Sequence, residues 1–446
     1  MKNGNSATAV EVGEELHEDE QLRPIIGLVE ALDYRSLHFV NRPLDHFHVL
    51  VGPNASGKTN FLDVIAFLGK LVSEGLESAV GERTQNFKDL VFGKSRSWFE
   101  LAIEAKIPMS RRKLISDPNF DTIRYEIRLG IEKKTEEILL SAEKALLKIS
   151  SNSNAKNALQ RRLFPDEIRS PGSILSRKMK RGTRTVINKV IDGNDNFYSE
   201  VYGPAGKGWA PAFKLGPRKS TLGNLPEDES KFPVTTWLKR LLIEGVQQFI
   251  LNSLLIRKAS PPGQIRNFKS DGSNLPWVIE TLQRKDPVRF KDWISHLQTA
   301  LPDIEDIRTV ERPDDRHRYL VIKYRGGWEL PSWVVSDGTL RLLALTLPAY
   351  LSDFEGVYLI EEPENGIHPR AVETMFQSLS SVYGAQILLA THSPIILGLA
   401  DVSTVLCFAK NPDGATDIVK GSDHPELKEW KGETNLGSLF AAGVLG

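Results

Sequence analysis

Gly52-Pro-Asn-Ala-Ser-Gly-Lys-Thr59 decides the interpretation of this chain, because a Gly-x-x-x-x-Gly-Lys-Thr run between a strand and a helix builds a phosphate cradle. Residues 48–51 (His-Val-Leu-Val) are typical of a short buried strand, and apolar residues recur at helical spacing over 61–68. The glycines let backbone N–H groups turn inward, and the following helix N-terminus adds partial positive charge. The stretch therefore predicts that the chain binds a nucleoside triphosphate.

The polar side chains of this loop have distinct predicted roles. Lys58 is expected to reach the β- and γ-phosphates, and the hydroxyl of Thr59 is expected to ligate Mg²⁺. A chance glycine-rich turn before a helix is the alternative, but the fitting flanks favour the phosphate cradle. The predicted nucleotide contacts are Gly52, Pro53, Asn54, Ala55, Ser56, Gly57, Lys58, Thr59 and Asn60.

A second buried-strand pattern, residues 357–360 (Val-Tyr-Leu-Ile), ends in two carboxylates, Glu361 and Glu362. In such a Walker B arrangement the first acid holds the Mg²⁺ shell, and the second polarises the attacking water. The usual first acid is Asp, so Glu361 keeps the charge but adds a methylene that shifts the metal geometry. An acidic pair at a strand end is otherwise a solvated loop start, and the phosphate cradle in the same chain favours the catalytic interpretation.

Two further motifs flank this acidic pair. Ser336-Asp-Gly-Thr-Leu-Arg341 precedes an apolar run, 342–347, that predicts a helix; Ser336 could cap it, and Gly338 leaves its first turn open for an anion. Downstream, residues 386–390 predict another buried strand, which ends in Thr391-His392-Ser393-Pro394. A His at a strand tip is more often a surface residue than a catalytic one, but its position after the acidic pair favours a role in the site.

These motifs, in this order, resemble those of ABC-type ATPases, and more closely those of the SMC/RecF/OLD-like branch of AAA-family ATPases. The resemblance rests on residues 32–37 (LDYRSL), 270–275 (SDGSNL), 336–341 (SDGTLR) and 361–369 (EEPENGIHP), besides the phosphate cradle and the Thr-His-Ser-Pro tip. It is strong over roughly residues 25–70 and 265–446 and weak between them.

The resemblance implies an α/β fold, with a P-loop NTPase core of the ABC type. Such a core has a mixed sheet with flanking helices and an antiparallel β subdomain, and here it would carry an inserted α/β arm. We expect a disordered tail over 1–24, the ATPase core over 25–135 and 305–446, and an arm or lid over 136–304.

The resemblance also implies site roles and a partner. Nucleotide in ABC-type ATPases lies between the P-loop of one subunit and the signature of another, so Ser336 and Gly338 would contact the γ-phosphate bound by a second chain. Asp337 between them is a further expected nucleotide contact. A working unit would therefore be a homodimer or a higher homo-oligomer. The resemblance implies Glu362 as general base, His392 as the γ-phosphate sensor, and residues 365–368 as the loop that crosses to the opposite site. Lys58 is the third expected catalytic residue, and Arg35 is a further expected nucleotide contact. The expected metal ligands are Thr59, Glu361 and Gln85, the last as a glutamine-loop residue.

Length, charge and composition restrict which kinds of protein this chain can be. A chain of 446 residues with 40% apolar residues can hold an ATPase core and an inserted subdomain. The formal net charge is zero, so no overall field draws the chain onto nucleic acid or anionic lipid. With the single cysteine, Cys407, no disulfide can form within the chain, which suits the cytoplasm. No apolar run approaches the roughly 18 residues of a membrane span, so we expect no membrane partner.

The remaining sequence predicts accessory structure. Residues 98–107 and 122–131 alternate apolar and polar side chains, which predicts antiparallel strands. Residues 232–256 and 275–301 show helical apolar spacing, and no sustained heptad run indicates a coiled coil, so a compact arm is expected. Residues 401–420 predict one or two finishing strands.

The densest basic cluster leaves two interpretations open. It could neutralise phosphates of DNA or RNA, or it could be the solvated face of a hairpin, and no nucleic-acid-binding motif accompanies it. Its members are Arg177, Lys178, Lys180, Arg181, Arg184 and Lys189.

The motifs together predict an ATP- and Mg²⁺-dependent dimerising ATPase that acts as a conformational switch. By family analogy it would control a nucleic-acid-processing or phage-defence effector, a nuclease or toxin encoded nearby. One alternative is an ATP-bound scaffold with negligible turnover that binds a partner protein, and another is a DNA-repair type ATPase that binds DNA directly.

Overall fold

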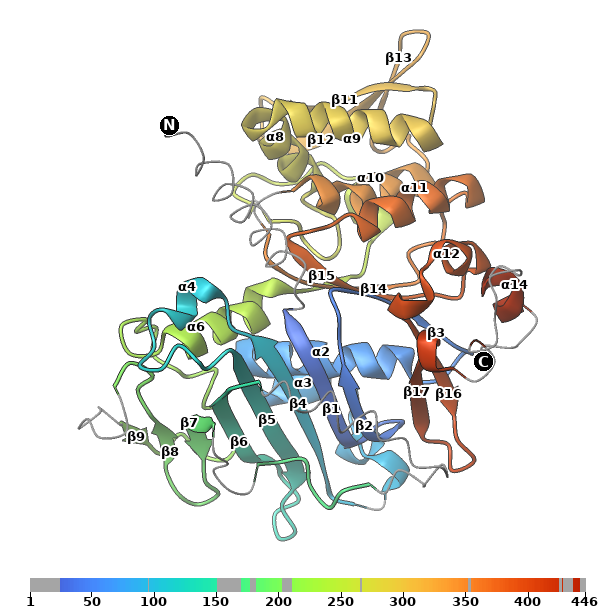
Figure 1. Cartoon of the computed structure of the whole chain (residues 1–446). Coiled ribbons are helices and arrows are strands. Elements are labelled where there is room, and N and C mark those ends of the chain that lie inside the picture. The colour runs from blue at the N-terminus through green and yellow to red at the C-terminus, as the bar shows by residue number, and fades with distance from the viewer. Residues whose placement is uncertain are drawn as a thin grey trace, which may run out of the picture.

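Two large sheets enclose helix α2 (Lys58–Ser73), which directly follows the phosphate cradle (Figure 1). The computed structural model describes residues 25–94, 96–150, 170–176, 182–202, 211–264, 267–351, 354–424, 427 and 436–441. The expected disordered tail over 1–24 lies outside these residues, as does most of the basic cluster.

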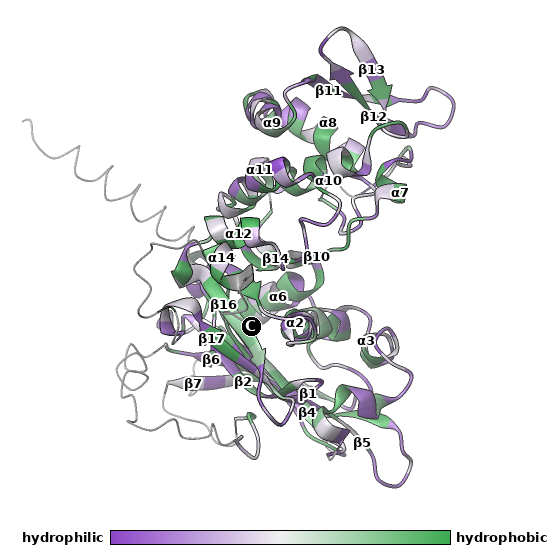
Figure 2. Ribbon diagram, turned by 90° about the vertical axis from the view of Figure 1, so that its right-hand side faces the viewer, coloured by the Kyte–Doolittle hydropathy of each residue, from purple (hydrophilic) through white to green (hydrophobic). Residues whose placement is uncertain are grey.

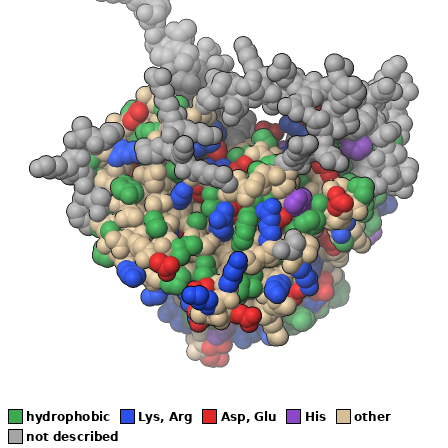
Figure 3. Space-filling view, turned by 90° about the horizontal axis from the view of Figure 1, so that it is seen from below, with side chains coloured by type: hydrophobic (Ala, Val, Ile, Leu, Met, Phe, Trp, Pro, Cys, Tyr) green, Lys and Arg blue, Asp and Glu red, His purple; other side chains and the backbone are tan. Residues whose placement is uncertain are grey.

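The first sheet is antiparallel and has the strand order β2-β1-β4-β5-β6-β7-β8-β9 within the described residues. Its inner face packs on α2, and the long pairing of β4 with β5 confirms the strands predicted over 98–107 and 122–131. Because side chains alternate along a strand, its outer face carries charged residues instead, such as the ion pairs Arg124–Glu126 and Arg128–Glu100. On the underside of the molecule, Lys and Arg side chains are intermixed with Asp and Glu (Figure 3). The strands are β1 (Ile26–Tyr34), β2 (Leu37–Pro43), β4 (Trp98–Lys106), β5 (Thr122–Ile131), β6 (Ile138–Lys148), β7 (Thr183–Lys189), β8 (Asp195–Phe197) and β9 (Ala212–Phe213).

The second sheet has the order β10-β14-β15-β3-β16-β17, and all its neighbours are parallel except β16 and β17. Both faces are covered, as parallel sheets require: Leu50 joins the core around α2, whereas Val49 and Val51 join the core on the other face. The strands are β3 (Phe47–Val51), β10 (Val246–Phe249), β14 (Gly356–Glu361), β15 (Ala385–Ala390), β16 (Val405–Lys410) and β17 (Thr416–Lys420). The predicted mixed α/β class, with an antiparallel subdomain, is confirmed.

Helices α10 (Asp337–Thr346), α11 (Pro369–Ser380) and α12 (Pro394–Leu399) cover the second face of the parallel sheet. Beyond them lie α8 (Leu275–Lys285), α9 (Pro287–Ala300) and a three-stranded sheet of β11 (Ile304–Glu311), β12 (Arg318–Tyr324) and β13 (Trp328–Pro331) (Figure 2). Shorter helices are α3 (Leu76–Gly81), α4 (Met109–Arg112), α6 (Pro233–Arg240), α7 (Ser253–Ile256) and α14 (Leu436–Ala441). In the described ranges, no helix has the length and apolar character to cross a bilayer.

The helix expected over 232–256 is interrupted, because Val246–Phe249 forms strand β10 and only Ser253–Ile256 is helical again, as α7. Helix α6 passes through a π-helical turn at Leu241–Gly245 into β10, which pairs in parallel with β14. Apolar spacing predicted a helix because it cannot reveal a partner strand more than a hundred residues away, and that partner decides the local structure.

Residues 136–304, the expected arm, contribute strands to both large sheets. Strand β6 pairs with β5 along its whole length, and β10 forms the edge of the parallel sheet. Helices α8 and α9 are separated at Asp286, whose side chain accepts a hydrogen bond from the Arg289 N–H and so caps α9.

Candidate functional site

The loop between β3 and α2 takes the geometry that its glycines permit. Gly57 has φ +107°, and a Cβ on it would lie 2.1 Å from Thr416 Oγ1 and 2.8 Å from Ser36 Oγ. Thr416 Oγ1 also donates a hydrogen bond to the Ser56 carbonyl oxygen at 2.8 Å. Strand β17 therefore holds the loop from outside, and only glycine fits at position 57.

Lys58 reaches back over this loop. Its Nζ donates hydrogen bonds to the carbonyl oxygens of Gly52 at 2.8 Å and Pro53 at 3.0 Å. Burial lowers the pKa of Lys58 to about 8, against the opposing effect of Glu362 and Glu361. The ammonium group thus lies inside the loop, where phosphate oxygens could replace the two carbonyl acceptors.

Nucleotide affinity should therefore fall at high pH. The fraction of Lys58 that is protonated drops about tenfold from pH 7 to pH 9 for a pKa near 8, and the phosphates need the charged form. We expect the association constant for ATP to decrease by about that factor, with proton uptake at pH 9. Isothermal titration calorimetry in two buffers of different ionisation enthalpy measures both quantities. Equal affinities at pH 7 and pH 9, without proton uptake, would contradict the role of Lys58.

Thr59 and Glu361 meet at the end of β14. Thr59 Oγ1 donates to Glu361 Oε2 at 2.5 Å. Among the described residues no cluster of three or more His, Cys, Asp or Glu side chains could hold a metal ion by itself. A hydroxyl and a single carboxylate fit Mg²⁺, which commonly binds through one or two protein oxygens and substrate phosphates.

Glu362 is held in a strained backbone conformation beside this pair. Its φ is +45°, which is uncommon outside glycine, and its N–H donates to the Ala390 carbonyl oxygen at 2.8 Å. The Asn365 side-chain amide donates to Glu362 Oε2 at 2.5 Å. The other oxygen, Oε1, lies 3.8 Å from His392 Nε2. The carboxylate is thereby aimed at the pocket and remains available to a water molecule.

His392 follows β15 and is positioned by a third carboxylate. Glu364 Oε1 accepts hydrogen bonds from the His392 N–H at 3.0 Å and from Thr391 Oγ1 at 2.6 Å. Burial and the nearby Lys58 ammonium lower the pKa of His392. The imidazole is therefore neutral at pH 7 and can donate one hydrogen bond without adding charge.

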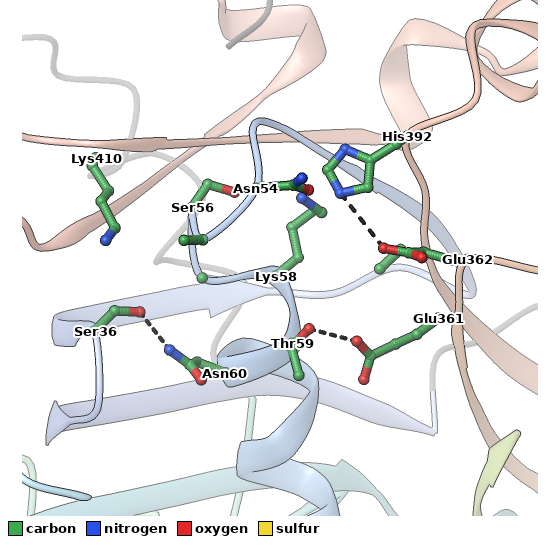
Figure 4. Close-up of a pocket in the computed structure, with 13 residues that line it drawn as sticks. Ser36, Asn54, Ser56, Lys58, Thr59, Asn60, Glu361, Glu362, His392 and Lys410 are labelled. Atoms are coloured by element: carbon green, nitrogen blue, oxygen red, sulfur yellow. Dashed lines mark hydrogen bonds and ion pairs between the residues drawn. The ribbon is translucent and has the colours of Figure 1, made fainter. Parts of the chain in front are cut away.

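These groups surround one cavity of about 390 Å³, a volume suited to a small-molecule ligand (Figure 4). Segments far apart in the sequence form it: the β1–β2 turn, the glycine-rich loop and the ends of β14, β15 and β16. The lining residues are Ser36, Asn54, Ala55, Ser56, Gly57, Lys58, Thr59, Asn60, Glu361, Glu362, Ala390, His392 and Lys410.

Residues 336–341, which resemble the ABC signature, do not line this cavity. Ser336 Oγ caps α10 by accepting from the Thr339 N–H at 3.2 Å, and Asp337 pairs with Arg257 at 2.6 Å. A Cβ on Gly338 would lie 2.7 Å from the Gly366 carbonyl oxygen, so close packing already explains this glycine.

Four other predicted residues also do not line the cavity. Gly52 and Pro53 instead present their carbonyl oxygens to Lys58 Nζ. Gln85 is exposed in the loop after α3 and does not line the cavity. Arg35 is adjacent to the lining residue Ser36 and donates to Asn60 Oδ1 at 3.3 Å, so it supports Asn60 from behind.

Three lining residues were not predicted: Ser36, Ala390 and Lys410. Ser36 directly follows the predicted Arg35, and its Oγ accepts from the Asn60 side-chain amide at 2.7 Å. Ala390 occupies the end of the buried strand before the predicted His392. No motif indicated Lys410, because only the pairing of β16 with β3 brings it to the site.

Comparisons with known proteins concern the family and the fold of the chain. The family model described as "AAA domain, putative AbiEii toxin, Type IV TA system" matches residues 47–398. No curated protein matches the chain. A crystal structure of the SmcHead bound to the C-winged helix domain of ScpA is 14% identical, covers 89% of this chain and 98% of its own, and has a TM-score of 0.51. An Smc head domain with an extended coiled coil from Pyrococcus furiosus, bound to the C-terminal domain of ScpA, is also 14% identical, with coverages of 89% and 96% and a TM-score of 0.47.

Proposed function

Because this chain belongs to the AAA domain family described as putative AbiEii toxin of type IV TA systems, and has an ABC-type ATPase fold of the SMC-like branch, we propose that it hydrolyses ATP as a dimerising switch. The observation that carries the proposal is the convergence of Lys58, Thr59, Glu361, Glu362 and His392 on one cavity.

The geometry supports attack of water on the γ-phosphorus. Glu362 would accept a proton from the water as its oxygen bonds to phosphorus, while the bond to the β–γ bridging oxygen breaks and ADP leaves. Lys58 would balance charge on the β- and γ-phosphates, and His392 would donate to a γ-phosphate oxygen. Mg²⁺, held by Thr59 and Glu361 together with phosphate oxygens, would supply further positive charge.

Dimerisation is proposed from the position of the signature. Ser336 and Asp337 are exposed at the start of α10 and lie outside their own cavity, so a second chain can reach them with its own cavity. Exposed apolar side chains flank them: Leu254 is 71% exposed, Trp333 48% and Val334 57%. Burial of these side chains between two copies would stabilise the closed dimer.

ATP should drive dimer formation when hydrolysis is blocked. We expect Glu362→Gln with ATP and Mg²⁺ to form dimers in light scattering, and ADP to leave it monomeric. Adding Ser336→Arg to this variant should abolish the dimer because the longer cation obstructs the shared interface. Ser295→Arg, on the exposed face of α9, is the matched control and should dimerise normally. Full turnover by monomers at high dilution would refute the shared site.

We propose that the switch acts on an effector protein. The family description names a toxin of a type IV TA system, and the SmcHead structure contains a bound domain of ScpA, which supports a partner-controlling role in defence. Direct DNA binding has less support. Of the basic cluster, Arg184 donates to Ser116 Oγ at 2.5 Å and Lys189 is buried against Asp195 at 2.7 Å, so both already have internal partners.

A further inference from the structure

We propose that Lys410 binds the nucleoside end of the nucleotide, through the α-phosphate and the adjoining ribose, and so sets affinity for ATP and ADP alike. This inference rests on the proposed ATP-binding function and assigns a contact that no motif of the chain indicates.

The two ends of the cavity carry different side chains. Thr59, Glu361, Glu362 and His392 gather at one end, where the metal and the γ-phosphate belong. Figure 4 shows Lys410 on the opposite side of the glycine-rich loop from His392, with its side chain directed toward the part of the cavity that contains Ser36. A triphosphate chain is linear, so a γ-phosphate at the first end places the α-phosphate and ribose toward the second.

The backbone at Lys410 is fixed relative to the phosphate loop. Strand β16 pairs in parallel with β3, with Cys407 opposite Val51 just before the loop begins. On its other side Lys410 pairs with Thr416 of β17. Thr416 is in turn hydrogen-bonded to the loop through the Ser56 carbonyl oxygen and to Ser36 Oγ at 2.8 Å. The Lys410 side chain therefore extends from a rigid support at the wall of the cavity.

The charge of Lys410 is available to a ligand. In the part of the chain that the structure describes, its Nζ has no hydrogen bond or ion pair, and its side chain is exposed. The two carboxylates of the cavity, Glu361 and Glu362, lie at the far end, and Lys58 is directed there as well. An unpaired ammonium at the nucleoside end complements the α-phosphate, whose charge Lys58 does not cover.

The test measures ATP and ADP affinities separately. The Glu362→Gln background prevents turnover, and displacement of a fluorescent ADP analogue gives both dissociation constants in Mg²⁺. We expect Lys410→Ala to weaken ATP and ADP by the same factor, about three- to tenfold, and Lys410→Arg to restore most of the affinity. Lys420→Ala, on β17 and paired with Asp45 at 3.0 Å, removes a lysine away from the cavity and should change neither constant.

The outcomes separate this inference from the function on which it rests. If the background protein binds neither nucleotide, the proposed function fails and the Lys410 contact fails with it. If it binds both, and Lys410→Ala behaves like Lys420→Ala, only the Lys410 contact is refuted. A loss confined to ATP would place Lys410 at the γ-phosphate and would also refute the proposal.

Discussion

Replacing Glu362 by Gln is expected to lower kcat for ATP hydrolysis by about 10² to 10³-fold while leaving the dissociation constant for ATP within about threefold. Glutamine keeps the shape of the side chain and can still accept the hydrogen bond from Asn365. It cannot accept a proton from the attacking water at neutral pH. The lost quantity is therefore transition-state stabilisation and not ground-state binding, and steady-state kinetics with equilibrium nucleotide binding measures the two separately.

A matched substitution tests whether the effect belongs to the site. Glu373→Gln, on the exposed face of α11, makes the same chemical change outside the cavity and should leave kcat unchanged. If wild type and Glu362→Gln turn over ATP at the same near-background rate, the chain is a scaffold that binds nucleotide without using it. Equal and rapid rates would instead show that another group accepts the proton.

The parts of the site that were predictable lie in continuous motifs. For residues 52–59 and the strand before Glu361, the local sequence pattern alone predicts the structure. A strand followed by a loop and a helix fixes where Lys58 and Thr59 lie. The structure brings residues 54–59 and Glu361 together with His392 in one cavity. The strand ends of a parallel sheet share one edge, which explains why motifs separated by hundreds of residues converge.

Contacts that depend on strand order could not be predicted in this way. Lys410 reaches the cavity because β16 pairs with β3. Residues 246–249 form strand β10 because they pair with the neighbouring strand β14. Neither pairing leaves a local pattern, and the helical spacing over 232–256 even favoured the wrong element. Gln85 was wrongly predicted as a site residue from its position along the chain, because it lies outside the cavity.

A buried carboxylate of the antiparallel sheet makes another contact between distant segments that no local pattern predicted. Removing this carboxylate should have a large effect on stability. Glu143 in β6 is fully buried and accepts hydrogen bonds from Tyr125 Oη at 2.8 Å, Ser220 Oγ at 2.8 Å and the Thr221 and Leu222 N–H groups at 2.6 and 2.9 Å. It thereby fastens residues 220–222, which are distant in sequence, to the sheet that packs on α2. Burial and the Glu143 charge raise the pKa of Tyr125, so its hydroxyl stays protonated and remains a donor.

Glu143→Ala should therefore reduce the free energy of unfolding by about 3 to 5 kcal/mol, because it leaves several buried donors without an acceptor. Glu143→Gln keeps one acceptor oxygen but turns an amide toward these donors, so it should fall between Ala and wild type. Urea denaturation followed by fluorescence measures both, and Glu137→Ala, exposed in the β5–β6 turn, should stay within about 0.5 kcal/mol of wild type. If Glu143→Ala is as stable as Glu137→Ala, residues 220–222 are held by their apolar contacts, among them the buried Leu222, and the carboxylate is dispensable.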